Sequence, residues 1–311
     1  MQPIANEISR LKALEQALQE SFRGEAYLDS FSRGIYSTDA SHYQMIPNCV
    51  VVPRDEADCV RAVQLAAEHG LPITPRGGAT SLSGQTFGTG MVLDLSKYMD
   101  KVLEVNLDEC WARVQPGVVR DRLNTHLAPN RMHLAPDPAT TSRATIGGMI
   151  GNNASGTRSI VYGKTIDHVL SCRVALADGT VVDLEEKDLN QWRGLAQDDT
   201  NEGRIYREIE AVINNNRDEI LARYPKVMRR VSGYNLDEFV DGAGYSGSIG
   251  GRSHITPRPW NLSNLFVGSE GTLGVLLEAK IRITPLPNAT ALAIVHFDDL
   301  LESLRHIPTI N

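Results

Sequence analysis

The stretch PRGGATSLSGQ, residues 75–85, holds three glycines and four small or hydroxyl-bearing residues between the apolar runs LPIT and MVLDL. Glycine accepts positive φ and lets a ligand approach the backbone, so that successive N–H groups can point at one place. Thr80, Ser81 and Ser83 add hydroxyl donors. The composition favours a phosphate-binding loop, and an ordinary tight turn is the alternative that this stretch alone leaves open.

The segments before this loop predict a parallel sheet. CVVVP, residues 49–53, has the pattern of a buried strand, and residues 54–70 predict a helix with Asp55 as N-cap and Gly70 at its end. LPITP, residues 71–75, predicts the next strand. A strand, a helix and a strand in this order form a right-handed crossover, so the glycine-rich loop leaves the carboxyl end of a strand.

The other expected elements mix helices and strands. They are, in chain order, an amphipathic helix over residues 8–22, short strands from residue 91, a helix over 118–127, a hairpin turning at Asp178-Gly179, a helix over 202–223, a surface loop over 240–259, a strand over 274–287, and a final strand and helix over 290–311. The fold class is therefore α+β.

The last strand and helix cannot bury their own apolar side chains, among them Leu292, Ile294, Leu300 and Leu304. We therefore expect the chain to stop partway into another domain and to self-associate through this surface.

Composition excludes several classes of protein. The 311 residues are 41% hydrophobic and 22% charged, as in a globular protein, and the net charge of −7 argues against a nucleic-acid partner. Every apolar run is shorter than the roughly 18 to 20 residues of a membrane span, and the N-terminus is polar, so we expect a cytoplasmic protein. The four cysteines, Cys49, Cys59, Cys110 and Cys172, lie far apart and are expected to be buried, reduced thiols.

Two apparent motifs fail on their spacing. YGKT, residues 162–165, ends like a nucleotide-triphosphate loop, but Arg158 stands where that loop needs its first glycine. His126 and His133 have no carboxylate at ligand spacing, so no metal site is expected.

Two further stretches are, like the first, rich in glycine and small polar residues. TIGGMIGNNASG, residues 145–156, combines four glycines with two asparagines and two hydroxyl-bearing residues, although a helix packed through small residues would have the same composition. GSEGTLG, residues 268–274, precedes a strand rather than a helix and so is not a Rossmann fingerprint.

Together, PRGGATSLSGQ, PDPATTSRATIGGMIGNNASG and LFVGSEGTLGVL resemble the FAD-binding (PCMH-type) domain of the vanillyl-alcohol-oxidase-like flavoproteins. YGKTIDHVL and SGYNL make the chain similar to the branch of D-lactate dehydrogenases, glycolate oxidase flavin subunits and D-2-hydroxyglutarate dehydrogenases. The resemblance implies a fold of two α/β subdomains over residues 39–287, after a helical lead-in over 1–38 and before the start of a cap domain over 288–311.

The resemblance also implies which residues contact non-covalent FAD. Backbone from Arg76 to Ser81 would hold the pyrophosphate, and Ala79 stands where covalent relatives carry a histidine. The implied cofactor-binding residues are Arg76, Gly77, Gly78, Ala79, Thr80, Ser81, Pro136, Asp137, Thr141, Thr145, Gly147, Gly148, Asn152, Ala154, Ser155, Gly156, Glu270, Gly271, Leu273 and Gly274. For Asp137, between two prolines, a turn-forming role is the alternative.

The implied reaction is oxidation of a 2-hydroxy acid, with hydride transfer to the flavin and electrons passed to a quinone, cytochrome or iron-sulfur module. The family's catalytic base comes from the cap, so none is assigned here and the chain alone is expected to be inactive. Arg143 is the one candidate for a substrate-side cation, against the alternative of an exposed arginine. A non-catalytic FAD-binding subunit is the second hypothesis, and an alkyl-dihydroxyacetonephosphate-synthase-like transferase ranks last.

Overall fold

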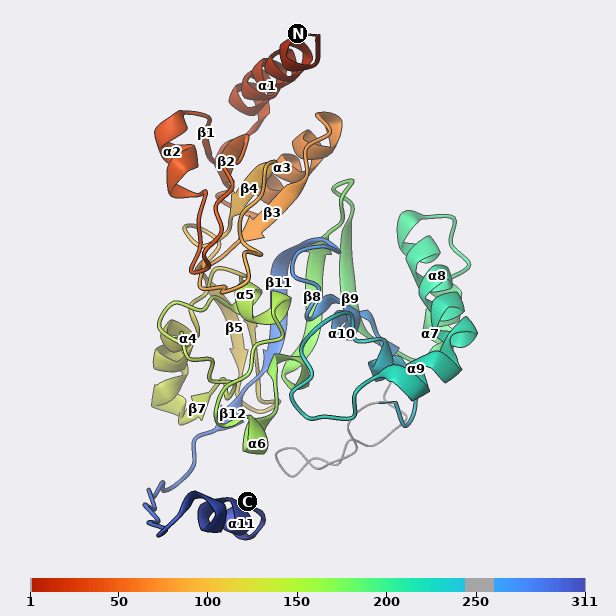
Figure 1. Ribbon diagram of the computed structural model, residues 1–311. Coiled ribbons are helices and arrows are strands. Elements are labelled where there is room, and N and C mark those ends of the chain that lie inside the picture. Colours follow the sequence, from red (N-terminus) through yellow and green to blue (C-terminus); the bar gives the residue numbers. More distant parts are fainter. Residues whose placement is uncertain (1, 244–259, 311) are drawn as a thin grey trace.

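The glycine-rich loop leaves the carboxyl end of a strand in a four-stranded sheet, as the sequence predicts. The computed structural model describes residues 2–243 and 260–310 (Figure 1). The sheet has the order β1-β2-β4-β3 and consists of β1 (Glu25–Tyr27), β2 (Cys49–Val52), β4 (Met91–Asp94) and β3 (Ile73–Arg76). β2 and β3 are parallel, but each pairs with β4, which lies between them.

Helices α1 (Gln2–Ser21), α2 (Ser30–Ile35) and α3 (Glu56–Glu68) accompany this sheet (Figure 1). Asp55 caps α3 by accepting a hydrogen bond from the Asp58 backbone N–H, and Gly70 ends the helix with φ +60°. Leu14 and Leu18 of α1 are buried in the same core as β2 and α3, which confirms the predicted amphipathic helix.

The second sheet has six antiparallel strands in the order β10-β9-β8-β11-β6-β5. Its strands are β10 (Trp260–Asn261), β9 (Val181–Lys187), β8 (Val169–Ala175), β11 (Val275–Arg282), β6 (Trp111–Val114) and β5 (Val102–Asn106). β8 and β9 form the expected hairpin, with Gly179 at φ +85°. β11 comes last in sequence yet lies between β8 and β6.

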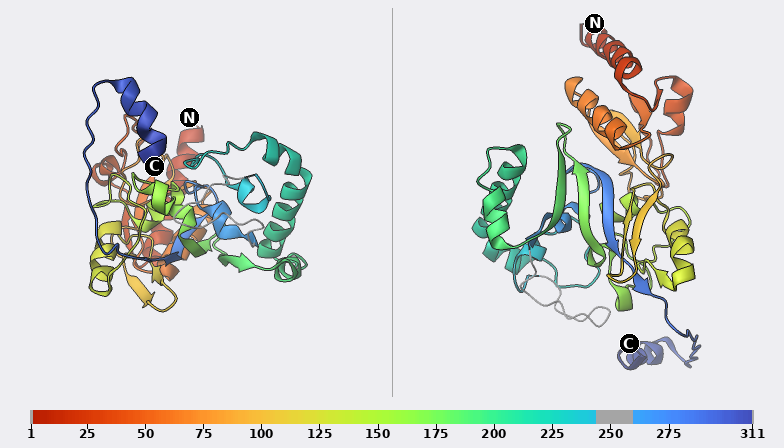
Figure 2. Two further views of the ribbon diagram at one scale, coloured as in Figure 1. Left: turned by 90° about the horizontal axis from the view of Figure 1, so that it is seen from below. Right: turned by 180° about the vertical axis from the view of Figure 1, so that it is seen from behind.

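Helices lie on both sides of β8 and β11 (Figure 2). One side has α4 (Arg120–Leu127), and the other has α7 (Leu189–Leu195), α8 (Asn201–Asn215) and α9 (Arg217–Arg223). Trp192 of α7 packs edge-on against Tyr206 of α8, with ring centroids 4.6 Å apart. The shorter elements are the helices α5 (Ile146–Gly151), α6 (Ser159–Tyr162) and α10 (Leu262–Phe266), the 3-10 turns Ala128–Asn130, Thr165–Asp167 and Leu236–Phe239, and the strand pair β7 (Met132–His133) and β12 (Thr284–Pro285).

The two sheets share hydrophobic packing. Ala175, Val275 and Leu277, from β8 and β11 of the second sheet, are buried in the core of the first. Arg173 of β8 adds an ion pair to Glu56 of α3, with 3.0 Å between Nε and Oε1. The seam between the sheets is therefore fixed by side chains from both.

Three expectations differ from the structure. The helix expected over residues 202–223 is two helices, because Asn216 has non-helical dihedral angles and its Nδ2 donates to the Val212 carbonyl at 2.7 Å, competing with the backbone ladder. Cys110 is half-buried rather than buried, since it lies at φ 57° in the turn between β5 and β6, whereas the other three cysteines are buried. The surface loop expected over 240–259 lies mostly outside the described residues.

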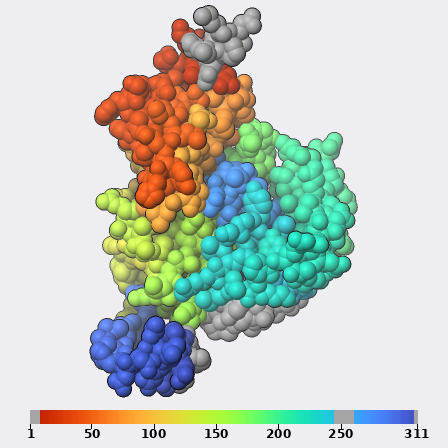
Figure 3. Space-filling view, viewed as in Figure 1, coloured from red at the N-terminus to blue at the C-terminus, as the bar shows by residue number. Residues whose placement is uncertain are grey.

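The third difference is at the C-terminus. Residues 290–297 form no strand, because they pair with no other segment of the described chain. They lead into α11 (Leu300–Ile310), which forms a separate lobe in the space-filling view (Figure 3). Leu292 is 87% exposed and Leu300 73% exposed, so the apolar surface expected from the sequence is present.

We predict that this surface drives self-association, since Leu300, Leu301 and Leu304 expose large apolar side chains along α11. Light scattering over a wide concentration range should show a mass that rises with concentration. The double variant L300K/L304K should lower that mass toward the monomer. A wild-type chain that stays monomeric at every concentration contradicts the prediction.

A second prediction concerns His133 of β7, which is buried with its Nδ1 2.9 Å from the Thr284 carbonyl. Burial, and to a lesser degree the charges of Arg120 and Arg158, lowers the pKa of His133 below its ordinary value of 6.5. The folded state therefore favours the neutral ring, and below about pH 6.5 the unfolded state binds a proton that the folded state does not.

The free energy of unfolding should consequently fall as the pH is lowered below about 6.5. Urea denaturation of the wild type and of His133→Phe at several pH values tests this, because histidines elsewhere affect both proteins equally. The wild type should lose more stability than the variant on acidification. Equal losses would show that His133 titrates alike in both states.

Candidate functional site

A cavity of about 200 Å³ lies at the seam between the two sheets. The structure brings fourteen of the residues named from the sequence together in its wall: Arg76, Gly77, Gly78, Ala79, Thr80, Ser81, Thr145, Gly147, Gly148, Asn152, Ala154, Glu270, Gly271 and Gly274. They come from all three glycine-rich stretches, which are far apart in the chain. The cavity is thus the one place where the three stretches meet in the described residues.

The paired glycines let two loops touch. A Cβ atom on Gly77 would lie 2.1 Å from the Thr145 hydroxyl oxygen, and one on Gly78 would lie 2.3 Å from the Arg143 carbonyl oxygen. Thr145 in turn caps α5, because its hydroxyl accepts from the Gly148 backbone N–H at 3.2 Å. Because neither glycine has a side chain, the first loop can pack closely against the start of α5.

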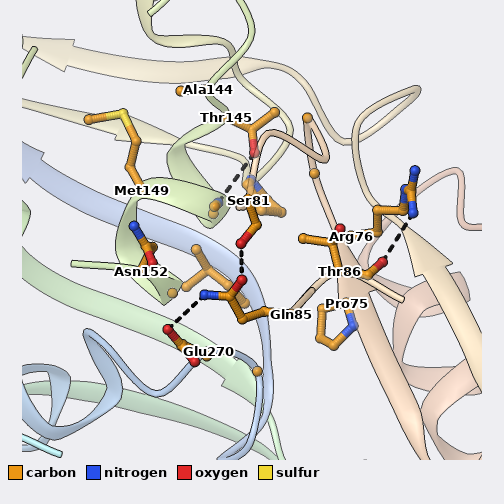
Figure 4. A pocket seen from close by; sticks show the side chains of 18 of the residues that line it. Pro75, Arg76, Ser81, Gln85, Thr86, Ala144, Thr145, Met149, Asn152 and Glu270 are labelled. Atoms are coloured by element: carbon orange, nitrogen blue, oxygen red, sulfur yellow. Dashed lines mark hydrogen bonds between the residues drawn. The ribbon is translucent and has the colours of Figure 1, made fainter. Parts of the chain in front are cut away.

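The Arg76 side chain is turned away from the loop that follows it. Its guanidinium donates to the carbonyls of Tyr36, Thr38 and Thr86 at 2.8 to 3.2 Å, and the bond to Thr86 is drawn in Figure 4. Burial lowers the pKa of this guanidinium. The charge of Arg76 thus fixes the N-terminal segment, and its backbone remains the part that faces the cavity.

Glu270 is the other charged residue of the cavity wall. It lies at φ 52°, and its carboxylate accepts from Gln85 Nε2 at 3.0 Å, while Ser81 donates to the Gln85 side-chain carbonyl (Figure 4). This bridge joins the first and third glycine-rich stretches. Glu270 is itself an anion, and the Arg76 guanidinium is already bonded to three carbonyls. Backbone N–H and hydroxyl groups are therefore the donors available to an anion.

Six residues named from the sequence lie outside the cavity wall: Pro136, Asp137, Thr141, Ser155, Gly156 and Leu273. Asp137 accepts from the Arg158 backbone N–H at 3.2 Å and from the Thr157 hydroxyl at 3.3 Å, so its carboxylate joins segments about twenty residues apart rather than closing a local turn. Thr141 donates to Asp121 at 2.9 Å. Arg143 is exposed and also lies outside the wall.

Sequence reasoning missed the remaining wall residues, which are Pro75, Gln85, Thr86, Leu95, Pro116, Pro138, Thr140, Ala144, Met149, Gly151, Phe266, Ser269 and Leu276. Gln85 and Ser269 stand inside the quoted motifs, where their polar side chains were a usable signal. Leu95 and Pro116 come singly from other segments and carry no local pattern.

Within the described ranges, His, Cys, Asp and Glu side chains nowhere gather in groups able to hold a metal ion. Of the helices described, none is both long enough and apolar enough to cross a membrane.

Comparison with known proteins shows similarity to a flavin-binding family model and to two curated proteins. Residues 47–185 match the family model of an FAD binding domain. The chain is 37% identical over 301 residues to a D-2-hydroxyglutarate dehydrogenase of Pantoea ananatis, covering 96% of this chain and 28% of that protein. It is 30% identical to the glycolate oxidase subunit GlcD of Bacillus subtilis, covering 92% and 47%.

A solved structure shares the fold. Alkyldihydroxyacetonephosphate synthase superposes with a TM-score of 0.60 at 20% identity, over 89% of this chain and 42% of that one. The chain thus spans about 28% of the dehydrogenase and less than half of the synthase.

Gly78→Ala tests the contact between the two loops. Because the new Cβ would meet the backbone carbonyl of Arg143 at 2.3 Å, the loops must separate, and we expect the free energy of unfolding to fall by about 1–3 kcal/mol. Ligand binding in the cavity should weaken with it. Thermal and urea denaturation measure the first effect.

Gly34→Ala is the matched control. No atom lies within 4 Å of a Cβ at this position in α2, so the variant should be as stable as the wild type or more stable by up to about 1 kcal/mol. A Gly78→Ala protein as stable as the Gly34→Ala protein would contradict the tight contact.

Proposed function

We propose that this chain, whose residues 47–185 match the family model of an FAD binding domain, is the flavin-binding part of an FAD-dependent dehydrogenase of 2-hydroxy acids. The observation that carries the proposal is the meeting of the three glycine-rich stretches in one cavity within a fold of this type. The names of the relatives, D-2-hydroxyglutarate dehydrogenase and glycolate oxidase subunit, support the substrate class.

The cavity wall fits a dinucleotide. A pair of phosphates needs several donors in a small space, and the backbone from Gly77 to Ser81 offers successive N–H groups in a segment with no side chain larger than that of threonine. Thr80 and Thr140 line the same wall, and because the Thr140 hydroxyl donates to Thr80 Oγ1 at 3.4 Å, the Thr80 hydroxyl keeps its own proton for a ligand. These groups would bind the pyrophosphate, while Gly147, Gly148 and Asn152 would contact the ribityl side.

FAD, when bound, supplies a two-electron acceptor for the hydride of the substrate. The residues of this chain hold that cofactor and exclude water from its phosphates. We propose that the attachment is non-covalent, since Ala79 offers no nucleophile at the position where covalent relatives carry a histidine. The half-buried or buried cysteines, all unpaired, are consistent with a cytoplasmic location.

The base that accepts the substrate's hydroxyl proton is proposed to come from a cap domain that residues 288–311 begin, after the FAD-binding domain over 39–287. The wall of the cavity contains no histidine and no lysine, and its two charged side chains are already hydrogen-bonded, Arg76 to the Thr86 carbonyl and Glu270 to Gln85. The electron acceptor would be a quinone, a cytochrome or an iron-sulfur module.

A non-catalytic FAD-binding subunit is the second candidate function. It is supported by the similarity to a protein named as a subunit of glycolate oxidase, of which this chain covers 47%. The two functions share the cavity and differ in whether the bound flavin meets a hydroxy acid.

The first test is the visible spectrum of the chain after incubation with FAD and desalting. We expect flavin bands that remain with the protein and pass into the supernatant on acid precipitation. Flavin that stays in the acid pellet would show a covalent link, and a folded chain without flavin would refute the proposed cofactor.

The second test uses a chimera, in which this chain replaces the matching segment of the D-2-hydroxyglutarate dehydrogenase of Pantoea ananatis. The FAD-loaded chain alone should keep its flavin oxidised with D-2-hydroxyglutarate, D-lactate or glycolate under anaerobic conditions, and the chimera should be reduced by at least one of them. A chimera that binds FAD but is reduced by none of the acids favours the non-catalytic subunit.

A further inference from the structure

The motifs YGKTIDHVL and SGYNL, which contribute no residue to the cavity wall, are joined to each other in the structure. Lys164 of the first motif is buried, and its Nζ donates at 3.0 Å to the carbonyl of Arg230, two residues before the second motif. The Arg230 guanidinium forms a buried ion pair with Asp237 and donates to Asn235 Oδ1 at 3.0 Å. Both the carbonyl and the side chain of Arg230 are therefore held in place.

Asn235 connects this network to the rest of the domain. Its side chain is buried, and its Nδ2 donates to the carbonyls of Asn264 and Val267 at 3.0 and 2.6 Å. Buried charges are costly to remove from water, so a network of this kind fixes the position of the chain more than it adds to stability. The preceding residue, Arg229, thus projects from a main chain that is fixed at the next position.

Arg229 is exposed and contacts the residue that follows another exposed arginine. Its Nε donates at 2.8 Å to the hydroxyl of the buried Ser159, which comes directly after Arg158. The nearest carboxylate to Arg158 is that of Asp137, with 3.8 Å between Nε and Oδ2. Among the described residues, no other carboxylate forms an ion pair with either arginine. Arg158 and Arg229, here called the arginine pair, thus set two positive charges against one negative charge.

The arginine pair lies past the end of the cavity that is remote from the phosphate-binding loop. Pro138 and Ala154 line the cavity, and the residues next to them pack together, since a Cβ atom on Gly156 would lie 1.9 Å from the Asp137 carbonyl oxygen. Seen from β3, the helix α6 lies beyond α5 and toward α11 (Figures 1 and 2). The wall of the cavity therefore leads from the phosphate-binding loop toward the arginine pair.

We propose that the arginine pair binds the distal carboxylate of a 2-hydroxy dicarboxylic acid substrate. This rests on the proposed function, in which residues 77–81 hold the pyrophosphate and the ribityl chain follows α5, so that the flavin ring lies toward α6. Arg143, the cation named from the sequence, lies at the phosphate end, because its carbonyl packs against Gly78.

The chemistry of the pair suits this role. A guanidinium presents planar N–H donors that match the two oxygens of a carboxylate, and a guanidinium that is already anchored loses less freedom on binding. Lactate and glycolate carry one carboxylate, next to the reacting carbon, and have no group to place at the pair. The arginine pair thus selects the longer acids with two carboxylates.

The first experiment is saturation-transfer NMR on the FAD-loaded chain with glutarate as the probe. Glutarate has the two carboxylates of the proposed substrate class and no reacting hydroxyl. The wild type should show transfer to glutarate, and Arg229→Gln and Arg158→Gln should each bind it at least roughly tenfold more weakly, since each loses a charged hydrogen bond.

Arg193→Gln is the matched control. Arg193 is an exposed arginine of α7 whose Nε lies 3.6 Å from Glu210 Oε1, so the variant removes the same charge from another surface. It should bind glutarate as the wild type does.

The second experiment measures KM and kcat of the chimera described above. Arg229→Gln should raise KM for D-2-hydroxyglutarate roughly tenfold with kcat little changed, and should leave KM for D-lactate within twofold of its original value. An arginine that only stabilises the fold would affect both acids alike.

Three outcomes would overturn the proposal. They are an FAD-loaded wild type without transfer to glutarate, an equal loss of binding in Arg193→Gln, and an equal rise of KM for both acids in the Arg229→Gln chimera. If Arg229→Gln unfolds early, Arg158→Gln, which keeps the bond between Arg229 and Ser159, must show the same losses. A folded wild type that binds no FAD refutes the proposed function instead.

Discussion

The contact between Gly77-Gly78 and residues 143–145 is the constraint on which the site depends. It brings the loop after β3 to the N-terminus of α5 at a distance that only hydrogen atoms at the two Cα positions allow. The glycines therefore serve the protein's own packing as well as access to a ligand. The residues of this contact that line the cavity, Gly77, Gly78, Ala144 and Thr145, thus belong to its wall on the side of the first sheet and α5.

The cavity is unusual for an anion site in having no free side-chain cation. The Arg76 guanidinium is bound to three carbonyls, and the Glu270 carboxylate is bound to Gln85. Direct hydrogen bonds to an anion would then come from oriented N–H and O–H groups, which need rigid backbone to stay aligned. The left-handed conformations of Ala79 and Glu270, each uncommon for a residue with a side chain, are held by this packing.

Much of the fold follows from the sequence, because strand and helix patterns around the three stretches are strong and local. The capped helix after Asp55 and the hairpin at Gly179 are examples. The insertion of β4 between β2 and β3 was missed, since pairing order depends on contacts between distant segments. In the site, fourteen residues of the glycine-rich motifs were found, whereas Leu95 and Pro116 reach the wall only through the tertiary fold.

The position of β11 has a consequence for synthesis. This strand occupies the middle of the second sheet, between β8 and β6, yet residues 275–282 follow nearly the whole domain in sequence. While the chain emerges from the ribosome, the β5–β6 and β8–β9 hairpins can form before β11 has been synthesised. Until β11 pairs with them, the edges of β6 and β8 that face it stay unpaired. Sheet completion is therefore a late, long-range step, and until it occurs those edges are open to pairing with other strands.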